Sequence, residues 1–234
     1  MVLAVSVIIP VLNEEDSIAA VLGHIPPQLA AEVLVVDNGC TDNTIPIARS
    51  LGARIVVAQE RGYGAACYAG TLAAKGNILV YLDGDYSDYP EEIVNLVEPI
   101  IADRADLVLG SRLARGDMPR DAMPLQQRLG NWLTAHLMRW LYQMQVTDLG
   151  PFRAIRKEAL LSLDMQEMTF GWPTEMMVKA ARADLRLKEV PVRYRPRLGG
   201  KSKISGTLRG TILAGYYILL TTFRYARGRH SLRN

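Results

Sequence analysis

The sequence predicts an α/β fold with a mostly parallel central sheet and helices on both faces of that sheet. In the first half of the chain, short apolar runs rich in Val, Ile and Leu alternate with segments of helical periodicity. The runs are nearly continuous in apolar residues, which is typical of strands buried on both faces of a parallel sheet. With 234 residues, of which 49% are hydrophobic, the chain is long enough to form one large core.

The elements of the first half follow one another in the order that right-handed βαβ crossovers require. Strands are expected where apolar residues run together, at 5–10, 32–37, 54–58, 77–83 and 106–112. Helices are expected at 14–24, 42–51, 63–75 and 90–101. Pro90 suits the first turn of the last helix, and we expect Asp88 to cap that helix.

The alternation ends after Arg112. Residues 124–144 place large apolar side chains on one broad helical face. An extended piece, two short helices and a last strand are expected at 147–155, 156–163, 173–183 and 187–195. We divide the chain into a domain of residues 1–198 and an appendage of residues 199–234 that holds a basic loop and an amphipathic helix.

The net charge of +3 conceals a division between a basic tail and an acidic body. Residues 191–234 contain no Asp or Glu and 10 Lys or Arg, so the other 190 residues carry −7. Such a tail indicates an anionic partner. Nucleic acid is disfavoured, because the aromatic residues Tyr216, Tyr217 and Phe223 lie among aliphatic side chains and not among basic ones.

The membrane surface is the partner that we favour for this tail. The apolar run at 211–223 has 13 residues, whereas a membrane-spanning helix needs roughly 20. The segment 206–226 is apolar nearly all round and has basic ends, as in a helix that lies in the membrane interface. Packing against a partner subunit is the alternative, so a homo-oligomer through this helix is possible. Trp132 and Trp140 beside Arg128 and Arg139 also fit an interfacial helix, although a core-packing helix is the default.

Polar side chains follow three of the predicted strands, in the sequences PVLNEE, DNGCTD and DGDYSD. Open α/β sheets bind ligands outside the carboxyl ends of their strands. Asp83 and Asp85 are two residues apart, so their carboxylates point the same way in extended backbone. Gly84 between them allows close approach to a ligand. We therefore predict that the pair binds Mg²⁺ or Mn²⁺, which holds a diphosphate; the alternative is an acidic turn without a metal.

A dinucleotide-binding loop is the rival interpretation of the sequence ERGYGAACYAG. Gly62 and Gly64 begin a G-x-G-x-x-G pattern, and Asp83 follows about 20 residues later, as in the fingerprint of nicotinamide-dependent enzymes. Cys67 occupies the place of the third glycine, and the pattern falls in the third unit of the fold, not the first. A nicotinamide enzyme is therefore disfavoured.

Six motifs, VSVIIPVLNEEDSI, VVDNGCTDNT, RGYGAA, YLDGDYSDYP, LVLGSR and TDLGPFRAIRKEAL, occur in an order and at spacings that resemble glycosyltransferase family 2. The resemblance covers about residues 4–195. It implies the GT-A fold, a nucleotide-sugar donor lying over the sheet and inversion at the anomeric centre. Within the family, the chain looks most like polyprenyl-phosphate sugar synthases of the dolichol-phosphate mannose type, on the further evidence of GSR at 110–112 and GGKSKIS at 199–205.

The resemblance also assigns roles to individual residues. It puts six residues around the nucleobase and ribose of the donor: Pro10, Asn13, Glu14, Asp37, Arg61 and Gly62. Asp83 and Asp85, with Gly84 between them, match the metal-binding pair. Gly199 and Gly200 would let the basic loop that carries Lys201 and Lys203 fold over a diphosphate, although a solvated basic turn is the alternative.

The acceptor decides which further groups are needed. A hydroxyl acceptor needs a general base, whereas a phosphate monoester is already anionic at neutral pH and needs cations to position it. Candidate cations are Arg112, Arg128, Arg153, Lys201 and Lys203. Asp148 is expected to orient an arginine or to touch the donor sugar. Glu175 stands where hydroxyl-acceptor members of the family often keep their base, but it is equally an ordinary first-turn acid.

The sequence thus predicts a metal-dependent, inverting glycosyltransferase, peripheral at the inner face of the cytoplasmic membrane, with Asp85, Arg112, Asp148 and Glu175 as its candidate catalytic residues. It would move a hexose from a UDP- or GDP-sugar to polyprenyl phosphate. One alternative is transfer to a hydroxyl of a saccharide or small molecule. The other is a nucleotide-binding protein without turnover.

Overall fold

The structure, a computed structural model, describes residues 4–114, 116, 123, 125–200 and 208–225. Its described residues form a seven-stranded sheet in the order β3-β2-β1-β4-β6-β5-β7. The strands are β1 (Val5–Val11), β2 (Ala30–Asp37), β3 (Arg54–Val57), β4 (Ile78–Tyr81), β5 (Leu107–Ser111), β6 (Arg153–Arg156) and β7 (Leu187–Pro191). Only β6 runs antiparallel to its neighbours, β4 and β5. The predicted α/β class with a mostly parallel sheet is confirmed.

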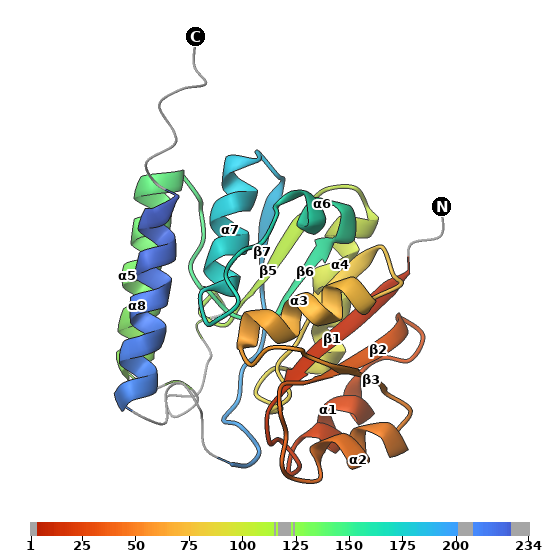
Figure 1. The fold of residues 1–234 in the computed structure, drawn as a ribbon. Helices are drawn as coiled ribbons and strands as arrows, with labels where there is room; N and C mark the ends of the chain where they lie inside the picture. Colours follow the sequence, from red (N-terminus) through yellow and green to blue (C-terminus); the bar gives the residue numbers. More distant parts are fainter. Residues whose placement is uncertain (1–3, 115, 117–122, 124, 201–207, 226–234) are drawn as a thin grey trace.

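Helices cover both faces of the sheet (Figure 1). They are α1 (Ile18–His24), α2 (Thr44–Ser50), α3 (Tyr63–Ala73), the 3-10 turn η1 (Pro90–Glu92), α4 (Ile93–Ile101), α5 (Leu125–Tyr142), α6 (Lys157–Ser162), α7 (Trp172–Arg182) and α8 (Leu208–Arg224). Helices α1, α2 and α4 pack with one buried cluster, and α3, α5, α6 and α7 with the other. Successive residues of β1 alternate between the two clusters, Val7 and Ile9 in one and Ile8 in the other, as the period of a strand requires.

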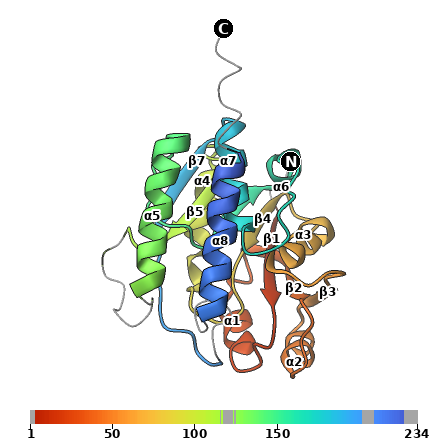
Figure 2. The ribbon, with the colours of Figure 1, turned by 60° about the vertical axis from the view of Figure 1, so that its left-hand side comes forward.

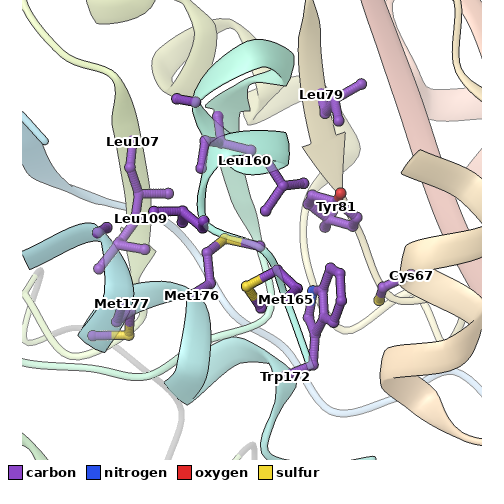
Figure 3. Packing of buried hydrophobic residues seen from close by; sticks show 14 of the residues in the cluster. Cys67, Leu79, Tyr81, Leu107, Leu109, Leu160, Met165, Trp172, Met176 and Met177 are labelled. Atoms are coloured by element: carbon purple, nitrogen blue, oxygen red, sulfur yellow. The ribbon is translucent and has the colours of Figure 1, made fainter. Parts of the chain in front are cut away.

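The cluster beneath α3 and α7 is built around Trp172. Its ring makes edge contacts with Tyr68 and Tyr81, at centroid distances of 6.1 and 6.4 Å. Figure 3 shows Trp172 beside Tyr81, Met165 and Met176, in the space between β4 and α7. This packing fixes β4, whose last residue is Tyr81, against the helical layer. The loop that follows β4 therefore starts from a rigid base.

Several boundaries differ from the predicted ones. Strand β4 ends at Tyr81, so Asp83 lies in the following loop. The predicted extended piece is a strand only from Arg153, and β7 ends at Pro191 because the chain then crosses to the loop after β4, where Tyr194 bridges Asp88. The expected cap at Asp88 is wrong, because Asp88 is buried and η1 has no side-chain cap hydrogen bond from the described residues.

The C-terminal helix α8 lies beside α5 (Figure 2), and the two helices form one edge of the molecule in Figure 1. It packs on α5 and α7, burying Thr221 and Thr222, and the Tyr142 hydroxyl donates to the Thr222 carbonyl. Among the described residues, no helix has the length and apolar character needed to cross a membrane. The described part of the appendage thus packs against the body, and the division at residue 198 stays a prediction.

The contact between α3 and β1 gives a test of this packing. A Cβ at Gly70 would overlap Ile8 Cγ2 and lie 3.0 Å from Val36 Cγ2. Gly70→Ala should therefore lower the free energy of unfolding by about 1–3 kcal/mol. Gly23→Ala in α1 is the matched control, because nothing lies within 4 Å of its Cβ position, and it should stabilise by about 0.5–1 kcal/mol. Urea unfolding measures both; an unchanged midpoint for Gly70→Ala would contradict this packing.

Candidate active site

The carboxyl ends of β1, β2 and β4 lie side by side and carry interlocked polar loops. The Asn13 carboxamide oxygen accepts from Thr41 N at 2.8 Å, and Glu14 N donates to Thr44 Oγ1 at 2.8 Å. The Ser17 hydroxyl donates to the Gly84 carbonyl at 2.8 Å. These bonds join the loop after β1 to both neighbouring loops. Sequence motifs that are far apart in the chain thus meet at one edge of the sheet.

Most of the predicted donor residues lie in these loops. Pro10 is buried in β1, where it pairs with Val36 of β2. One oxygen of Asp37, at the end of β2, accepts from the backbone of Gly39 and Cys40 at 2.9 and 2.7 Å. The structure therefore brings Asn13, Glu14 and Asp37 together.

Arg61 and Gly62 complete this side of the site. The Arg61 guanidinium lies against Gly39, where a Cβ would come within 3.1 Å of its Nε. Gly62 N donates to the Asn38 side chain at 2.9 Å. Gly62 has a φ of +157°, and a Cβ there would overlap the Met168 carbonyl. A glycine is therefore required where α3 begins.

Three carboxylates crowd the loop after β4. Asp83 accepts from the Tyr63 hydroxyl at 3.2 Å, and one Asp85 oxygen accepts from Ser87 N and Oγ at 3.0 and 2.6 Å. Burial and the charge of Asp85 raise the pKa of Asp83 to about 7. Asp88 is 1% exposed, and among the described residues neither of its carboxylate oxygens has a hydrogen-bond partner. Burial and the charge of Asp83 hold the pKa of Asp88 well above its usual range.

The Asp83–Asp85 pair fits a hard divalent cation. Carboxylate oxygens are the ligands that Mg²⁺ and Mn²⁺ favour, and a cation would relieve the repulsion that raises the pKa of Asp83. Within the described residues, no three His, Cys, Asp or Glu side chains are grouped to hold a metal ion. The protein would therefore supply few ligands and leave the remaining positions to water and to the phosphates of a ligand, as Mg²⁺ sites commonly do.

A segment after β7, residues 192–200, crosses this acidic loop, and we call it the strap. Leu198 N donates to the Asp85 carbonyl at 3.1 Å. Arg197 donates to Glu14 at 2.7 Å, and its other terminal nitrogen lies 3.8 Å from Asp85 Oδ2. A Cβ at Gly199 would come within 2.5 Å of Asp16 Cβ, so the glycine allows close approach. The predicted Lys201 and Lys203 lie outside the described residues, just after this point.

Sequence reasoning missed Arg195 and Arg197 of the strap. Their signal is the run RYRPR at 193–197, one residue before the two glycines, which composition alone assigns only to a basic tail.

Arg112 and Asp148 form a buried ion pair beside the strap. Two guanidinium nitrogens of Arg112 each donate to a different Asp148 oxygen at 2.7 Å, and Asn131 donates to the same carboxylate at 2.9 Å. Although burial alone would raise the pKa of Asp148, Arg112 holds it below its usual range. The Arg112 guanidinium also stacks on Tyr194 of the strap, 5.0 Å from the ring centroid. Asp148 thus orients an arginine, which was one of its two predicted roles.

Two predicted cations lie elsewhere. Arg128 is exposed on α5. Arg153 is 1% exposed in the core, where it donates to the carbonyls of Pro173 and Gly150, and burial lowers its pKa to about 10. The prediction that Arg153 positions an acceptor phosphate is wrong, because β6 pairs between β4 and β5 and carries this side chain inward.

Glu175 is fully buried at the start of α7, and its oxygens are occupied. It accepts from Gln166 N and Glu167 N, at 3.0 and 2.7 Å, and from the Tyr225 hydroxyl at 2.6 Å. Lys179 pairs with it at 3.0 Å. Although burial raises the pKa of Glu175, these donors, the Tyr225 hydroxyl first, hold it below its usual value. The carboxylate thus links the loop at residues 166–167 to Tyr225, which follows α8. Because its oxygens already accept these hydrogen bonds, a role as general base is disfavoured.

Comparison with protein families decides the class of the enzyme. The model of glycosyl transferase family 2 matches residues 6–163, more than half of the chain. This chain belongs to glycosyl transferase family 2. The predicted family is thus confirmed, and the acidic loop, the interlocked strand ends and the Gly62 turn all lie inside the matched region.

Curated relatives of this family 2 glycosyltransferase include polyprenyl-phosphate enzymes. An uncharacterized glycosyltransferase of Mycobacterium tuberculosis is 42% identical over 211 residues, covering 90% of this chain and 94% of the relative. A dolichyl-phosphate hexose transferase of Haloferax volcanii is 35% identical, covering 83% and 84%. An undecaprenyl-phosphate mannosyltransferase of Micrococcus luteus is 30% identical, covering 87% and 88%. The resemblance to polyprenyl-phosphate sugar synthases is confirmed.

The solved structures show the same fold. Glucosyl-3-phosphoglycerate synthase from Mycobacterium tuberculosis, in complex with Mn²⁺, uridine-diphosphate-glucose and phosphoglyceric acid, superposes with a TM-score of 0.78 and 24% identity. The match covers 96% of this chain and 80% of that chain. The predicted GT-A fold is confirmed.

The bonds of Glu175 predict the effect of its replacement. Glu175→Gln should keep glycosyl transfer within about tenfold of wild type, whereas loss of a general base typically costs ~10²–10⁴-fold. It should also lower the free energy of unfolding by about 1–3 kcal/mol, because a neutral amide leaves buried donors unsatisfied. Tyr225→Phe is the control for stability and should cost about 1 kcal/mol. A loss of about 100-fold or more with an unchanged unfolding midpoint would restore Glu175 as a base.

Proposed function

We propose that this enzyme transfers a hexose from a UDP- or GDP-sugar to polyprenyl phosphate, with Mg²⁺ or Mn²⁺ bound at Asp83 and Asp85. The observation that carries the proposal is the carboxylate pair after β4, set beside the interlocked ends of β1 and β2. A nucleotide-binding protein without turnover is disfavoured, because crowded carboxylates are costly to keep without a cation to bind.

The donor would lie across the ends of β1, β2 and β4. One Asp37 oxygen is held by backbone N–H groups, and we assign the other to a ribose hydroxyl. Asn13, Glu14, Arg61 and Gly62 surround the same place. A bound cation would neutralise the charge that develops on the departing nucleoside diphosphate. Lys201 and Lys203, one and three residues beyond the described strap, are proposed to approach that diphosphate.

The acceptor is proposed from the chemistry of the site together with the relatives. A phosphate oxygen attacks the anomeric carbon from the face opposite the diphosphate, the bond from that carbon to the diphosphate breaks, and the configuration inverts. A phosphate monoester needs no side chain to remove a proton, which agrees with the occupied oxygens of Glu175. Arg112, already oriented by Asp148, is the proposed cation for the acceptor phosphate. Two relatives are named for transfer to polyprenyl phosphates.

A peripheral position at the inner face of the cytoplasmic membrane is part of this proposal. Helix α5 turns Met138 and Tyr142 into the core but exposes Trp132 and Trp140, which are 58% and 78% exposed. Further large apolar side chains are exposed on α5 and α8: Leu125, Leu129, Leu133, Tyr216, Leu220 and Phe223. Arg128, Arg139 and Arg224 are exposed on the same two helices. An apolar surface of this size with basic residues suits the interface of an anionic membrane.

The metal and the acceptor can be tested in one assay with a panel of UDP- and GDP-sugars and Mn²⁺. Wild type should transfer sugar to a short polyprenyl phosphate and not to the polyprenol of equal length. Asp85→Asn and chelation should each abolish transfer, because the cation loses a ligand or is removed. Glu98→Gln, which alters an exposed carboxylate on α4, is the control and should leave the rate unchanged. Activity that survives in Asp85→Asn, or transfer to polyprenol alone, would contradict the proposal.

The proposed membrane surface on α5 and α8 can be tested by vesicle binding. The double variant Trp132→Ser/Trp140→Ser should bind anionic phosphatidylglycerol vesicles at least tenfold more weakly than wild type, roughly the effect of losing two buried aromatic side chains. Leu72→Ser, at an equally exposed site on α3, is the matched control and should bind as wild type. High salt should weaken binding without eliminating it, because only the charged part is screened. Unchanged vesicle binding with loss of a dimer in sedimentation would instead identify a subunit interface.

A further inference from the structure

We propose that Arg195 of the strap is a positioning residue that fixes the direction of the Asp85 carboxylate by holding the loop of residues 85–89. The inference rests on the proposed function, because it concerns Asp85 as a ligand of the divalent cation. The loop and the strap lie about a hundred residues apart in sequence: the bond from Arg195 to Tyr86 joins positions 109 residues apart.

The loop that carries Asp85 has a costly backbone conformation. Tyr86, directly after Asp85, has a φ of +63°, which a bulky side chain rarely adopts. The Asp85 side chain folds back over the same turn, where one oxygen accepts from Ser87 N and Oγ. A conformation of this kind persists only where its surroundings determine it. The direction of the second Asp85 oxygen therefore depends on what holds the turn.

Arg195 holds the turn along its whole length. Three successive carbonyl oxygens accept from it: that of Tyr86 from Nε at 2.7 Å, that of Ser87 from the backbone N at 3.0 Å, and that of Asp88 from Nη2 at 3.2 Å. The guanidinium is also sandwiched between two rings, 3.4 Å from the centroid of Tyr86 and 3.9 Å from that of Tyr89. One residue thus binds three carbonyls of the turn, two of them through its side chain, and its guanidinium contacts both aromatic rings.

The result is a carboxylate prepared for a ligand. With one oxygen bound to Ser87, the other, Oδ2, points to the side of Arg197, which also pairs with Glu14 of the donor site. Groups that contact a metal ligand and fix its orientation influence the affinity of the site for the metal. Their loss typically costs about 10–100-fold in metal binding. A lysine cannot replace Arg195 here, because its ammonium lacks both the planar surface and the forked donors.

Arg193 provides a matched control on the same strap. Its guanidinium stacks on Tyr89 at 4.1 Å, like that of Arg195, but its hydrogen bonds in the described residues go to Glu92 and not to the turn. Arg193→Lys therefore removes an equivalent stacked arginine and leaves the carbonyls of residues 86–88 bound.

The experiment measures Mn²⁺ binding directly, by the paramagnetic resonance signal of free Mn²⁺ in the presence of UDP or GDP. Arg195→Lys should weaken binding by about tenfold or more, and Arg193→Lys should bind as wild type. Transfer by Arg195→Lys should recover as Mn²⁺ is raised, which a general loss of folded protein would not produce. If Arg195→Lys does not fold, Tyr89→Leu takes its place, since it removes one face of the sandwich and keeps the apolar volume.

Wild-type Mn²⁺ affinity in Arg195→Lys or in its substitute overturns this proposal, as does an equal loss in Arg193→Lys. If wild type itself binds no Mn²⁺ with either nucleotide, the proposed function fails and this inference fails with it. If wild type binds Mn²⁺ and Arg195→Lys binds it equally well, only the role of Arg195 is overturned.

Discussion

The site is organised around the repulsion among Asp83, Asp85 and Asp88 at the end of β4. Strand β4 is the middle strand of the sheet, between β1 and β6, so the loop that follows it has neighbours on both sides. Asp88 is buried and Asp83 and Asp85 are partly buried, and the raised pKa values of Asp83 and Asp88 express the cost of bringing these carboxylates together away from water. A protein that keeps such a cluster must supply positive charge nearby or bind a cation. This chain supplies arginines to the loop, and we propose that it also binds a cation there.

The compensating charges come from distant parts of the chain. Arg112 follows β5, and Arg195 and Arg197 follow β7, the strand at the edge beyond it. Arg112 pairs with Asp148, and its charge also favours the ionised forms of Asp83 and Asp88, whereas Arg197 pairs with Glu14 and lies 3.8 Å from Asp85. The strap therefore covers the acidic loop from β7, an edge strand that β6 and β5 separate from β4. These arginines are positioned by the sheet, and the carboxylates lie in the loop after β4. The folded protein therefore holds the carboxylates close together even without a ligand.

Local pattern was enough to predict part of this arrangement. The apolar runs predicted the strands, and the two-residue spacing of Asp83 and Asp85 predicted the carboxylate pair. The inward direction of Arg153 was not predictable, since it follows from the antiparallel insertion of β6 between β4 and β5. Nor was the role of the strap, because Arg197 meets Glu14 across 183 residues. Periodicity reports which face of an element is apolar and says nothing about which distant segment will cover a loop.

The helix pair at the proposed membrane surface and the carboxylate pair share one continuous support. The Tyr225 hydroxyl, just after α8, binds Glu175, and Glu175 binds the backbone of residues 166 and 167. The carbonyls of residues 168 and 169 then accept from the first turn of α3, whose Tyr63 donates to Asp83. The phosphate of a lipid anchored in a membrane can reach a donor only if the donor lies at a fixed distance from the membrane surface. A rigid connection between the proposed membrane surface and the proposed donor loop would serve such a transfer, and in it buried Glu175 would act as a structural link and not as a base.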